Sequence, residues 1–289
     1  MAADRRTWIV QAGRGSELID FLSGAGDLSR RAAKRILDER RVFVNGHRTW
    51  MTRHALRPGD RVEVYGAWGG GGARRPAAAA ERDPDWARRV LWEDADYLVL
   101  DKPAGVTSNG PASAEERLRA ARAEPALAAA HRIDRDTTGC LVFARSPRAF
   151  DALVERFRRR EVKKEYEAIA IGRYPAGLRE IAEPVEGRPA RTLVRVVRAG
   201  EAASRLRLEI ESGRTHQIRR HLLSVRHPLA GDKEYGTGPA LPPALRAVPR
   251  QMLHAARVAF DHPLGGARVD VEAPLPADFA RALKDLGLG

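Results

Sequence analysis

The sequence predicts an α+β protein, in which a mixed, largely antiparallel sheet with helices follows a small N-terminal α/β unit. Two observations lead to this fold class. Residues 66–80, GAWGGGGARRPAAAA, are rich in glycine, alanine and proline and lack hydrophobic periodicity, which is typical of a flexible linker. After them, segments with strand character outnumber helical ones and often follow one another directly. We therefore expect a small domain over 1–65, a linker over 66–85 and a large domain over 86–289.

The N-terminal unit shows two helical segments followed by a hairpin. Residues 16–24, SELIDFLSG, predict a short helix that ends at a glycine. Residues 28–41 predict a second helix with Ser29 as its N-cap. VFVNG then predicts a strand and an Asn45-Gly46 hairpin turn, and LRPGDRVEVYG adds a turn and another strand. One face of the second helix is apolar, and the remaining surface carries Arg30, Arg31, Lys34, Arg35 and Arg41.

The larger unit alternates apolar strands with a few helical patterns. Lys102-Pro103-Ala104-Gly105 is expected to form a turn after the first of these strands. Strands are predicted at 97–100, 140–146, 165–172, 191–200 and 204–213, and helices at about 147–159, 217–224 and 277–286.

The charge of the chain favours a polyanionic partner. The 289 residues carry a formal net charge of +13, which fits nucleic acid or an anionic membrane surface. No stretch approaches about 18 consecutive apolar residues, so a membrane span is not expected. The N-terminus has no signal-peptide pattern, and Cys140, the only cysteine, is expected to pack in the core. We expect a protein of the reducing cytoplasm.

Several enzyme classes lack their motifs in this sequence. The glycine-rich phosphate loops of nucleotide-binding enzymes are absent, as are the other parts that would accompany the kinase-like HRID. His216 and His221 are five residues apart with no acidic ligand nearby, which does not favour a metal site. No serine lies in a nucleophile elbow. Carboxylate chemistry supported by basic residues remains.

Two dense charged clusters are the candidates for such chemistry. HRIDRDTTG, residues 131–139, precedes an apolar strand, and ESGRTHQIRRHL, residues 211–222, follows a strand and opens a helix. Each also has a structural interpretation. The acids of the first cluster can pair with its arginines in a solvated turn, or Asp136 can cap that turn. The second can combine helix capping with surface charge.

The segments resemble two known families. Residues 15–65 resemble the RNA-binding domain named after ribosomal protein S-four, which implies RNA contact through the second helix and the hairpin by Ser29, Arg30, Arg31, Lys34, Arg35 and Asn45. DKPAG, HRIDRDTTG, KKEYEAIAIG, GRPARTLVRV, ESGRTHQIRRHL, GDKEYG and LHAARVAFDHPLGG, in this order along 90–275, resemble the RluA-type pseudouridine synthases. Isoleucine at 133, threonine at 138 and cysteine at 140 depart mildly from that family's usual residues.

The second resemblance implies a role for each motif. Asp134 is implied to be the nucleophile in an isomerisation that breaks the N1–C1′ bond of a uridine in RNA and rejoins the base through C5. Whether it attacks C1′ of the sugar or C6 of the base stays open. Arg214 is implied to be its positive partner, Tyr166 to stack on the target base, and Arg132, beside His131, to contact the RNA. The resemblance implies no metal and no cofactor.

Alternatives to this interpretation remain at this point. A glycosidase would use Asp134 and Asp136 as its acid pair, whereas we expect Asp136 to fix the turn through Thr137 or Thr138. A non-catalytic RNA-binding or ribosome-assembly protein on the same fold is a second alternative. The resemblance favours large-subunit ribosomal RNA over transfer RNA as the substrate. We expect the protein to be a monomer.

Overall fold

The computed structural model describes residues 5–11, 17–26, 28–38, 41–49, 51–65, 84–110, 112–236 and 241–289. The chain divides into two compact units, Met1–Ala79 and Ala80–Gly289. Up to residue 83, the predicted linker lies outside the described residues, and a short helix, α3, begins at Pro84. No helix in the described ranges is long and apolar enough to cross a membrane.

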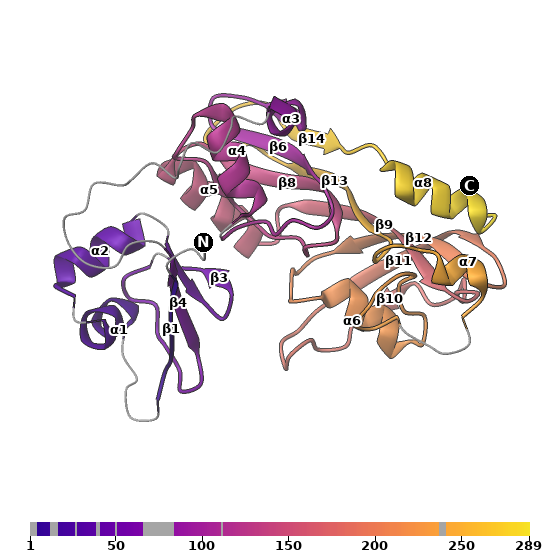
Figure 1. The fold of residues 1–289 in the computed structure, drawn as a ribbon, viewed down its shortest axis with the longest axis horizontal. Helices are drawn as coiled ribbons and strands as arrows, with labels where there is room; N and C mark the ends of the chain where they lie inside the picture. Colours follow the sequence, from indigo (N-terminus) through magenta and orange to yellow (C-terminus); the bar gives the residue numbers. More distant parts are fainter. Residues whose placement is uncertain are drawn as a thin grey trace. The chain divides into compact units, whose positions relative to one another are not determined.

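The first unit packs two helices against a small antiparallel sheet (Figure 1). The strand order is β1-β4-β2-β3, and all three pairings are antiparallel. Apolar residues of both helices and of the sheet form one core cluster. Its elements are β1 (Arg5–Ile9), α1 (Leu18–Ala25), α2 (Arg30–Asp38), β2 (Val42–Val44), β3 (His47–Arg48) and β4 (Arg61–Tyr65).

The predicted cap and turn are both present in this unit. The Oγ of Ser29 accepts a hydrogen bond from the N–H of Ala32 at 3.2 Å, so α2 begins where the sequence predicts. Asn45 and Gly46 both have positive φ, +53° and +75°, as a type I′ hairpin turn requires. The side chain of Asn45 also donates to Asp60 at 2.7 Å and thereby joins the hairpin to the neighbouring turn.

The second unit is built on one long sheet, and the predicted fold class is confirmed. The strand order is β10-β11-β12-β9-β13-β8-β6-β5, with β14 paired to β13 and β7 to β8. Every pairing is antiparallel except that of β13 with β8. Its strands are β5 (Val90–Glu93), β6 (Tyr97–Lys102), β7 (Ala128–Ala129), β8 (Thr138–Ala144), β9 (Lys163–Ile171), β10 (Glu180–Ile181), β11 (Thr192–Ala199), β12 (Ala203–Ile210), β13 (Leu253–Phe260) and β14 (Val269–Glu272).

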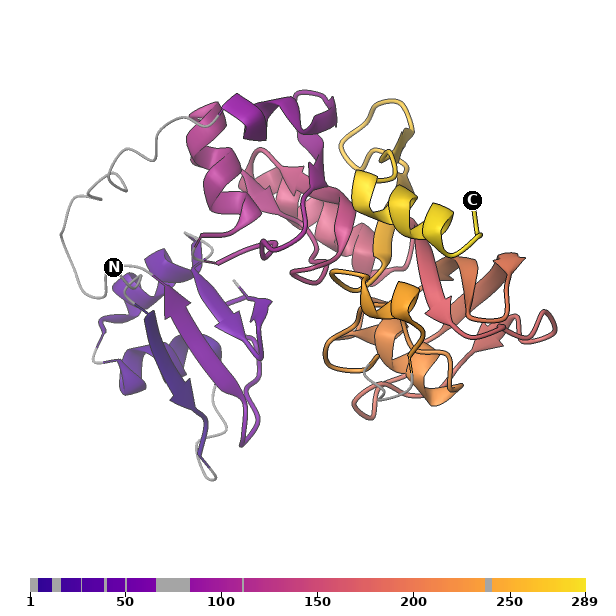
Figure 2. The same ribbon diagram turned by 45° about the vertical axis from the view of Figure 1, so that its right-hand side comes forward.

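Helices cover this sheet in separate places (Figures 1 and 2). Apolar residues of α3 and α4 pack with those of β6 and β8. Successive residues of β9 point to opposite faces, so Ala168 and Ala170 pack with α6 while Ile169 packs with α8. The helices are α3 (Pro84–Arg88), α4 (Ala114–Arg122), α5 (Pro147–Arg158), α6 (Gln217–Ser224), α7 (Pro243–Arg246) and α8 (Ala277–Asp285).

The parallel contact between β8 and β13 depends on Gly139. A Cβ at this position would lie 2.3 Å from the carbonyl oxygen of Ala255, and the φ of +101° also favours glycine. Beside it, Thr138 Oγ1 and His254 Nδ1 form a hydrogen bond of 2.9 Å between the two strands. This junction fixes the start of β8, and the charged loop 131–137 lies directly before it.

Candidate active site

Hydrogen bonds to its backbone hold the loop that carries Asp134. Ser108 Oγ donates to the carbonyl of Ile133 at 2.9 Å and accepts from the N–H of the same residue at 3.0 Å. The N–H of Thr137 donates to the carbonyl of Asp134 at 3.1 Å and closes a turn. Because the backbone is fixed on both sides of Asp134, its side chain has a defined direction.

Lys102 also holds this loop through hydrogen bonds. Its buried ammonium group donates to the carbonyls of Pro103, Val106 and Arg135 at 2.8, 2.7 and 2.9 Å. Burial lowers the pKa of Lys102 to about 7, with the charges of Asp136 and Asp134 opposing this effect. The lysine of DKPAG therefore joins the predicted turn to the loop of HRIDRD.

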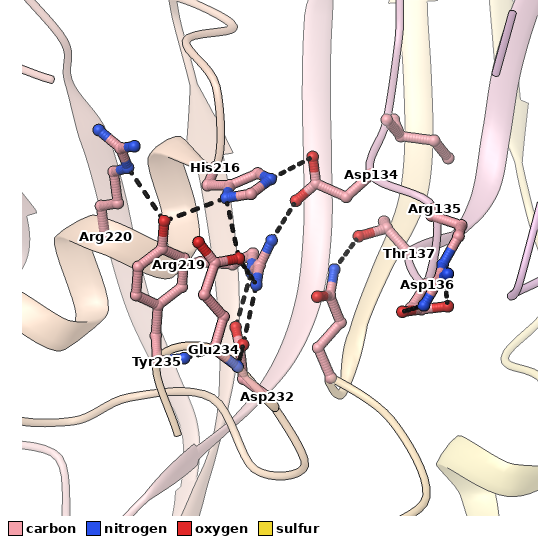
Figure 3. A network of polar contacts seen from close by, with 12 residues as sticks. Asp134, Arg135, Asp136, Thr137, His216, Arg219, Arg220, Asp232, Glu234 and Tyr235 are labelled. Carbon is pink, nitrogen blue, oxygen red and sulfur yellow. Dashed lines mark hydrogen bonds and ion pairs between the residues drawn. The ribbon is translucent and has the colours of Figure 1, made fainter. Parts of the chain in front are cut away.

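Asp134 points into a cavity and faces two basic side chains. Its carboxylate lies 3.5 Å from Arg219 Nη1 and 4.0 Å from His216 Nε2, and the side chain is 19% exposed (Figure 3). The cavity has a volume of about 340 Å³, within the range of small-molecule sites. It is lined by Thr107, Arg132, Asp134, Arg135, Asp136, His216, Arg219, Gly231, Lys233, Glu234, Arg250 and Gln251.

Arg219 is held in place by acids of the GDKEYG segment. Its Nε and Nη2 donate to the two oxygens of Asp232 at 2.6 and 2.9 Å, and Nη2 also donates to Glu234 at 3.0 Å. The guanidinium carbon lies 4.7 Å from the ring centre of Tyr235. Burial alone would lower the pKa of Arg219, but hydrogen bonding and charge from Asp232 more than offset it and raise the pKa. Arg219 therefore presents a fixed positive charge to Asp134.

Asp136 points away from Asp134 in this arrangement (Figure 3). Its carboxylate pairs with Arg135 at 3.1 Å, and its carbonyl accepts from Arg250 at 3.1 Å. We expected Asp136 to fix the turn through Thr137 or Thr138. The carboxylate bonds to Arg135 instead, whereas the hydroxyl of Thr137 accepts from Gln251 at 2.8 Å and that of Thr138 pairs with His254 at 2.9 Å.

Tyr166 lies on β9 and is only 6% exposed, within the apolar cluster that also contains Ile133. Burial and then the charge of Asp134 raise the pKa of Tyr166, so the phenol stays protonated. Tyr166 therefore lies largely beneath the surface, where the charge of Asp134 acts on its phenol. Stacking of its ring on a base stays a prediction.

Known proteins share both the sequence and the fold of this chain. A family model described as RNA pseudouridylate synthase matches residues 96–224. Ribosomal large subunit pseudouridine synthase D of Yersinia pestis is 33% identical, over 90% of this chain and 87% of that protein. The protein of the same name from Escherichia coli O157:H7 is 32% identical, over 89% of this chain and 86% of its own length.

The chain belongs to the RluA-type RNA pseudouridine synthases. Solved structures agree with this assignment at the level of the fold. Human RNA Pseudouridylate Synthase Domain Containing 4 matches 70% of this chain and 94% of that one, with a TM-score of 0.59 and 22% identity. Human RNA Pseudouridylate Synthase Domain Containing 1 matches 65% and 83%, with a TM-score of 0.54 and 26% identity. The family is one of isomerases that act on RNA. This assignment sets aside the two alternatives that the sequence left open, a glycosidase and a non-catalytic protein.

For this pseudouridine synthase, the expected pairing of Asp134 with Arg214 is wrong. Arg219 occupies the position next to Asp134, whereas Arg214 Nε donates to the carbonyl of Pro189 at 3.4 Å. The reason is the start of α6 at Gln217, which leaves Arg214 in the preceding loop and places Arg219 within the first turns of the helix. The partner that holds Arg219 is Asp232 of GDKEYG, whose burial is visible in the structure and not in the sequence.

His131 and Arg132 differ in their surroundings. His131 Nε2 accepts from the N–H of Val142 at 3.0 Å, and its ring packs on Phe157. Burial, together with the charge of Lys164, lowers the pKa of His131 to about 3, so the ring is neutral and supports β8. Arg132 is exposed and lines the cavity. RNA contact stays a prediction for both, and the geometry favours Arg132.

The residues expected to bind RNA in the first unit lie on its surface. Ser29, Arg30, Arg31, Lys34, Arg35 and Asn45 are all exposed. Arg30 pairs with Asp20 at 3.2 Å, and Ser29 and Asn45 also have the structural contacts described above. RNA binding by this face stays a prediction.

Neither a cofactor nor a metal was expected from the sequence. In the described part of the chain, no three histidine, cysteine, aspartate or glutamate side chains gather in a way that would hold a metal ion. Cys140 is buried in β8, and burial raises the pKa of its thiol to about 12, as suits a residue of the core.

Proposed function

We propose that this protein converts a uridine of large-subunit ribosomal RNA to pseudouridine, with Asp134 as the nucleophile. The observation that carries the proposal is the cavity in which Asp134 faces Arg219 and His216. We infer the substrate class from the relatives, each named ribosomal large subunit pseudouridine synthase D. The match covers 87% and 86% of their lengths. Because ribosomal RNA is the proposed substrate, we also propose that the protein acts in the cytoplasm.

The cavity accepts a nucleoside rather than a duplex. At about 340 Å³ it has the size of a small-molecule site, so the target uridine must leave the RNA stack to enter. Extrusion costs a few kcal/mol, which contacts with the backbone and the base offset. Arg132, exposed at the rim, is suited to occupy the position that the base vacates.

The reaction conserves its atoms without an external reagent. The N1–C1′ bond breaks, and the carboxylate of Asp134 bonds to C1′ of the sugar or to C6 of the base. The base turns, C5 bonds to C1′, and the bond to Asp134 breaks, which releases the free carboxylate. The proton at C5 then leaves, and N1 gains a proton, so uridine and pseudouridine are isomers. Arg219 orients the carboxylate of Asp134 throughout the reaction. The hydrogen bonds of Arg219 to Asp232 hold its guanidinium in place while the charge on Asp134 changes.

We propose a role in base binding for Tyr166 as well. Its ring belongs to the apolar cluster with Ile133, and its phenol stays protonated beside Asp134. We propose that the base contacts this ring when it turns. Tyr166→Phe should then keep most activity, whereas Tyr166→Ala should lose it, since the ring and not the hydroxyl is used.

The test maps pseudouridines in total RNA from cells with and without the gene. Loss of one large-subunit ribosomal position is expected, with restoration by the wild-type protein and none by Asp134→Asn. The variant should still bind the RNA within a few-fold, because basic side chains supply most of the affinity. Restoration by Asp134→Asn would remove Asp134 from its role, and a lost position in transfer RNA would correct the substrate.

A further inference from the structure

Three arginines from separate segments gather beside the loop that precedes α6. Arg160 follows α5, Arg188 ends the turn after β10, and Arg214 lies between β12 and α6. Arg214 Nε donates to the carbonyl of Pro189, the residue after Arg188. Arg160 Nη1 lies 3.6 Å from Glu211 Oε2, three residues before Arg214. These contacts define the arginine cluster of Arg160, Arg188 and Arg214.

The positive charge of this cluster exceeds its acidic partners. In the described ranges, no carboxylate lies within 4.0 Å of the guanidinium of Arg188 or Arg214. Glu211, the partner of Arg160, is shared with Arg191 at 2.7 Å, and Arg191 also pairs with Glu180 at 2.8 Å. Four arginines thus face two glutamates, which leaves two positive charges unbalanced.

The positive charges of Arg188 and Arg160 act on Arg214. Partial burial, followed by the charges of Arg188 and Arg160, lowers the pKa of Arg214. Like charges at such positions destabilise the free protein, and a bound anion relieves that repulsion. An arrangement of this kind is typical of sites that receive phosphate, whose oxygens match the guanidinium fork.

Hydrogen bonds of Gln217 hold the loop that carries Arg214. Gln217 is buried, and its Oε1 accepts from the N–H of Arg214 at 3.2 Å and from Ser212 Oγ at 2.7 Å. Its Nε2 donates to the carbonyl of Arg191 at 2.9 Å, which joins the loop to β11. The cluster is therefore held ready by a buried amide, so less ordering is needed when an anion binds.

The backbone of Arg214 lies close in the chain to a residue that lines the catalytic cavity. Arg214 precedes His216 by two residues, and two residues of extended chain span at most about 7 Å. His216 in turn faces Asp134. The strand that enters the cavity therefore passes near the loop that carries Arg214.

We propose that Arg160, Arg188 and Arg214 form a subsite for the RNA backbone phosphates that flank the target uridine. This subsite rests on the proposed activity on RNA and specifies how the strand beside the extruded nucleoside is held. It also gives a role to Arg214, which does not contact Asp134.

The first test compares two triple variants of the full chain with equal net charge. The test variant carries Arg160→Gln, Arg188→Gln and Arg214→Gln. The control carries Arg148→Gln, Arg246→Gln and Arg281→Gln, all exposed positions on α5, α7 and α8. Binding to a transcript of large-subunit ribosomal RNA is measured against salt concentration. Each lost phosphate contact lowers the slope of log K against log salt by about 0.7–0.9, so the test variant should lose about two and the control less than one.

Turnover gives an independent readout of the same variants. The test variant should raise KM about tenfold or more with kcat within about threefold, because phosphates flanking the reacting nucleoside contribute mainly uniform binding. A test variant that matches the control in both salt slope and KM overturns the subsite. If wild-type protein forms no pseudouridine but the slopes still differ, the proposed activity fails while the anion site stands. If the triple variant does not fold, Arg188→Gln alone, which lies in an exposed turn, is measured in its place.

Neutral phosphate analogues locate the subsite on the RNA. Single methylphosphonates are placed at each position flanking the mapped uridine in a short RNA. At one or two positions the wild-type protein should lose about fivefold to tenfold in affinity, while the test variant loses nothing further. Equal losses in both proteins at every position would overturn the assignment of these arginines to those phosphates.

Discussion

Substitution of Asp232 tests whether Arg219 must be held in place by this residue for the reaction to reach its full rate. Asp232 is fully buried at its side chain and binds two nitrogens of Arg219. It also accepts the backbone N–H groups of Glu234 and Tyr235 at 3.0 and 3.1 Å, and hydrogen bonding and charge of Arg219 lower its pKa against the effect of burial. Asp232→Asn keeps the shape of this side chain but turns one acceptor into a donor that faces the guanidinium.

The magnitude follows from the contacts that are lost. A hydrogen bond to a charged group contributes about 1.5–3 kcal/mol, and Asn removes one such bond to Arg219 along with the opposite charge. If Arg219 then shifts away from Asp134, the loss appears in the chemical step, which corresponds to about tenfold to 100-fold in kcat. KM should change by less than about threefold, because Asp232 does not line the cavity.

The assay follows the proton that leaves C5. RNA with tritium at C5 of uridine releases it to water as pseudouridine forms, which gives kcat and KM directly. Glu234→Gln is the matched control, since Glu234 also contacts Arg219 at 3.0 Å but is 55% exposed and contributes little. The reasoning is refuted if folded Asp232→Asn keeps kcat within threefold, or if Glu234→Gln loses as much.

Three further predictions concern neighbouring features. Asp136→Asn should keep activity within about tenfold, since the carboxylate pairs with exposed Arg135; complete loss in a folded variant would restore an acid-pair mechanism. The pKa of His131 is about 3 in the folded protein and about 6.5 in the unfolded chain, so its contribution to the free energy of unfolding is present above pH 6.5 and is lost as the pH falls. Urea unfolding should show a loss of about 1–2 kcal/mol by pH 5 in the wild-type protein, and His131→Gln should not show this loss. Removing residues 1–65 should weaken binding to structured RNA and flatten its salt dependence, and an unchanged slope would show that this unit does not hold RNA.

Local patterns carried most of the fold prediction. The helix over 147–159 appears as α5, and alternation over 191–213 appears as the hairpin of β11 and β12. The helix α4 was missed, because its alanine-rich sequence has no clear apolar periodicity. The parallel pairing of β8 with β13 was also out of reach, since Thr138 and its partner His254 are 116 residues apart. Contacts of that range depend on the packing of the whole sheet rather than on any local signal.

The site shows the same limit at the level of single side chains. The motif HRIDRDTTG made Asp134 the candidate nucleophile, because the resemblance to the family is carried by a short local stretch of sequence. Its cationic partner is not local: Arg214 and Arg219 lie in one motif and differ only in which side of the start of α6 they occupy. What separates them is Asp232, whose buried carboxylate is matched by a guanidinium from within the helix and not from the loop. The same geometry leaves Arg214 beside Pro189 and near Arg188 and Arg160, with no carboxylate within 4.0 Å in the described ranges, which is why we propose an anion of the RNA as its partner.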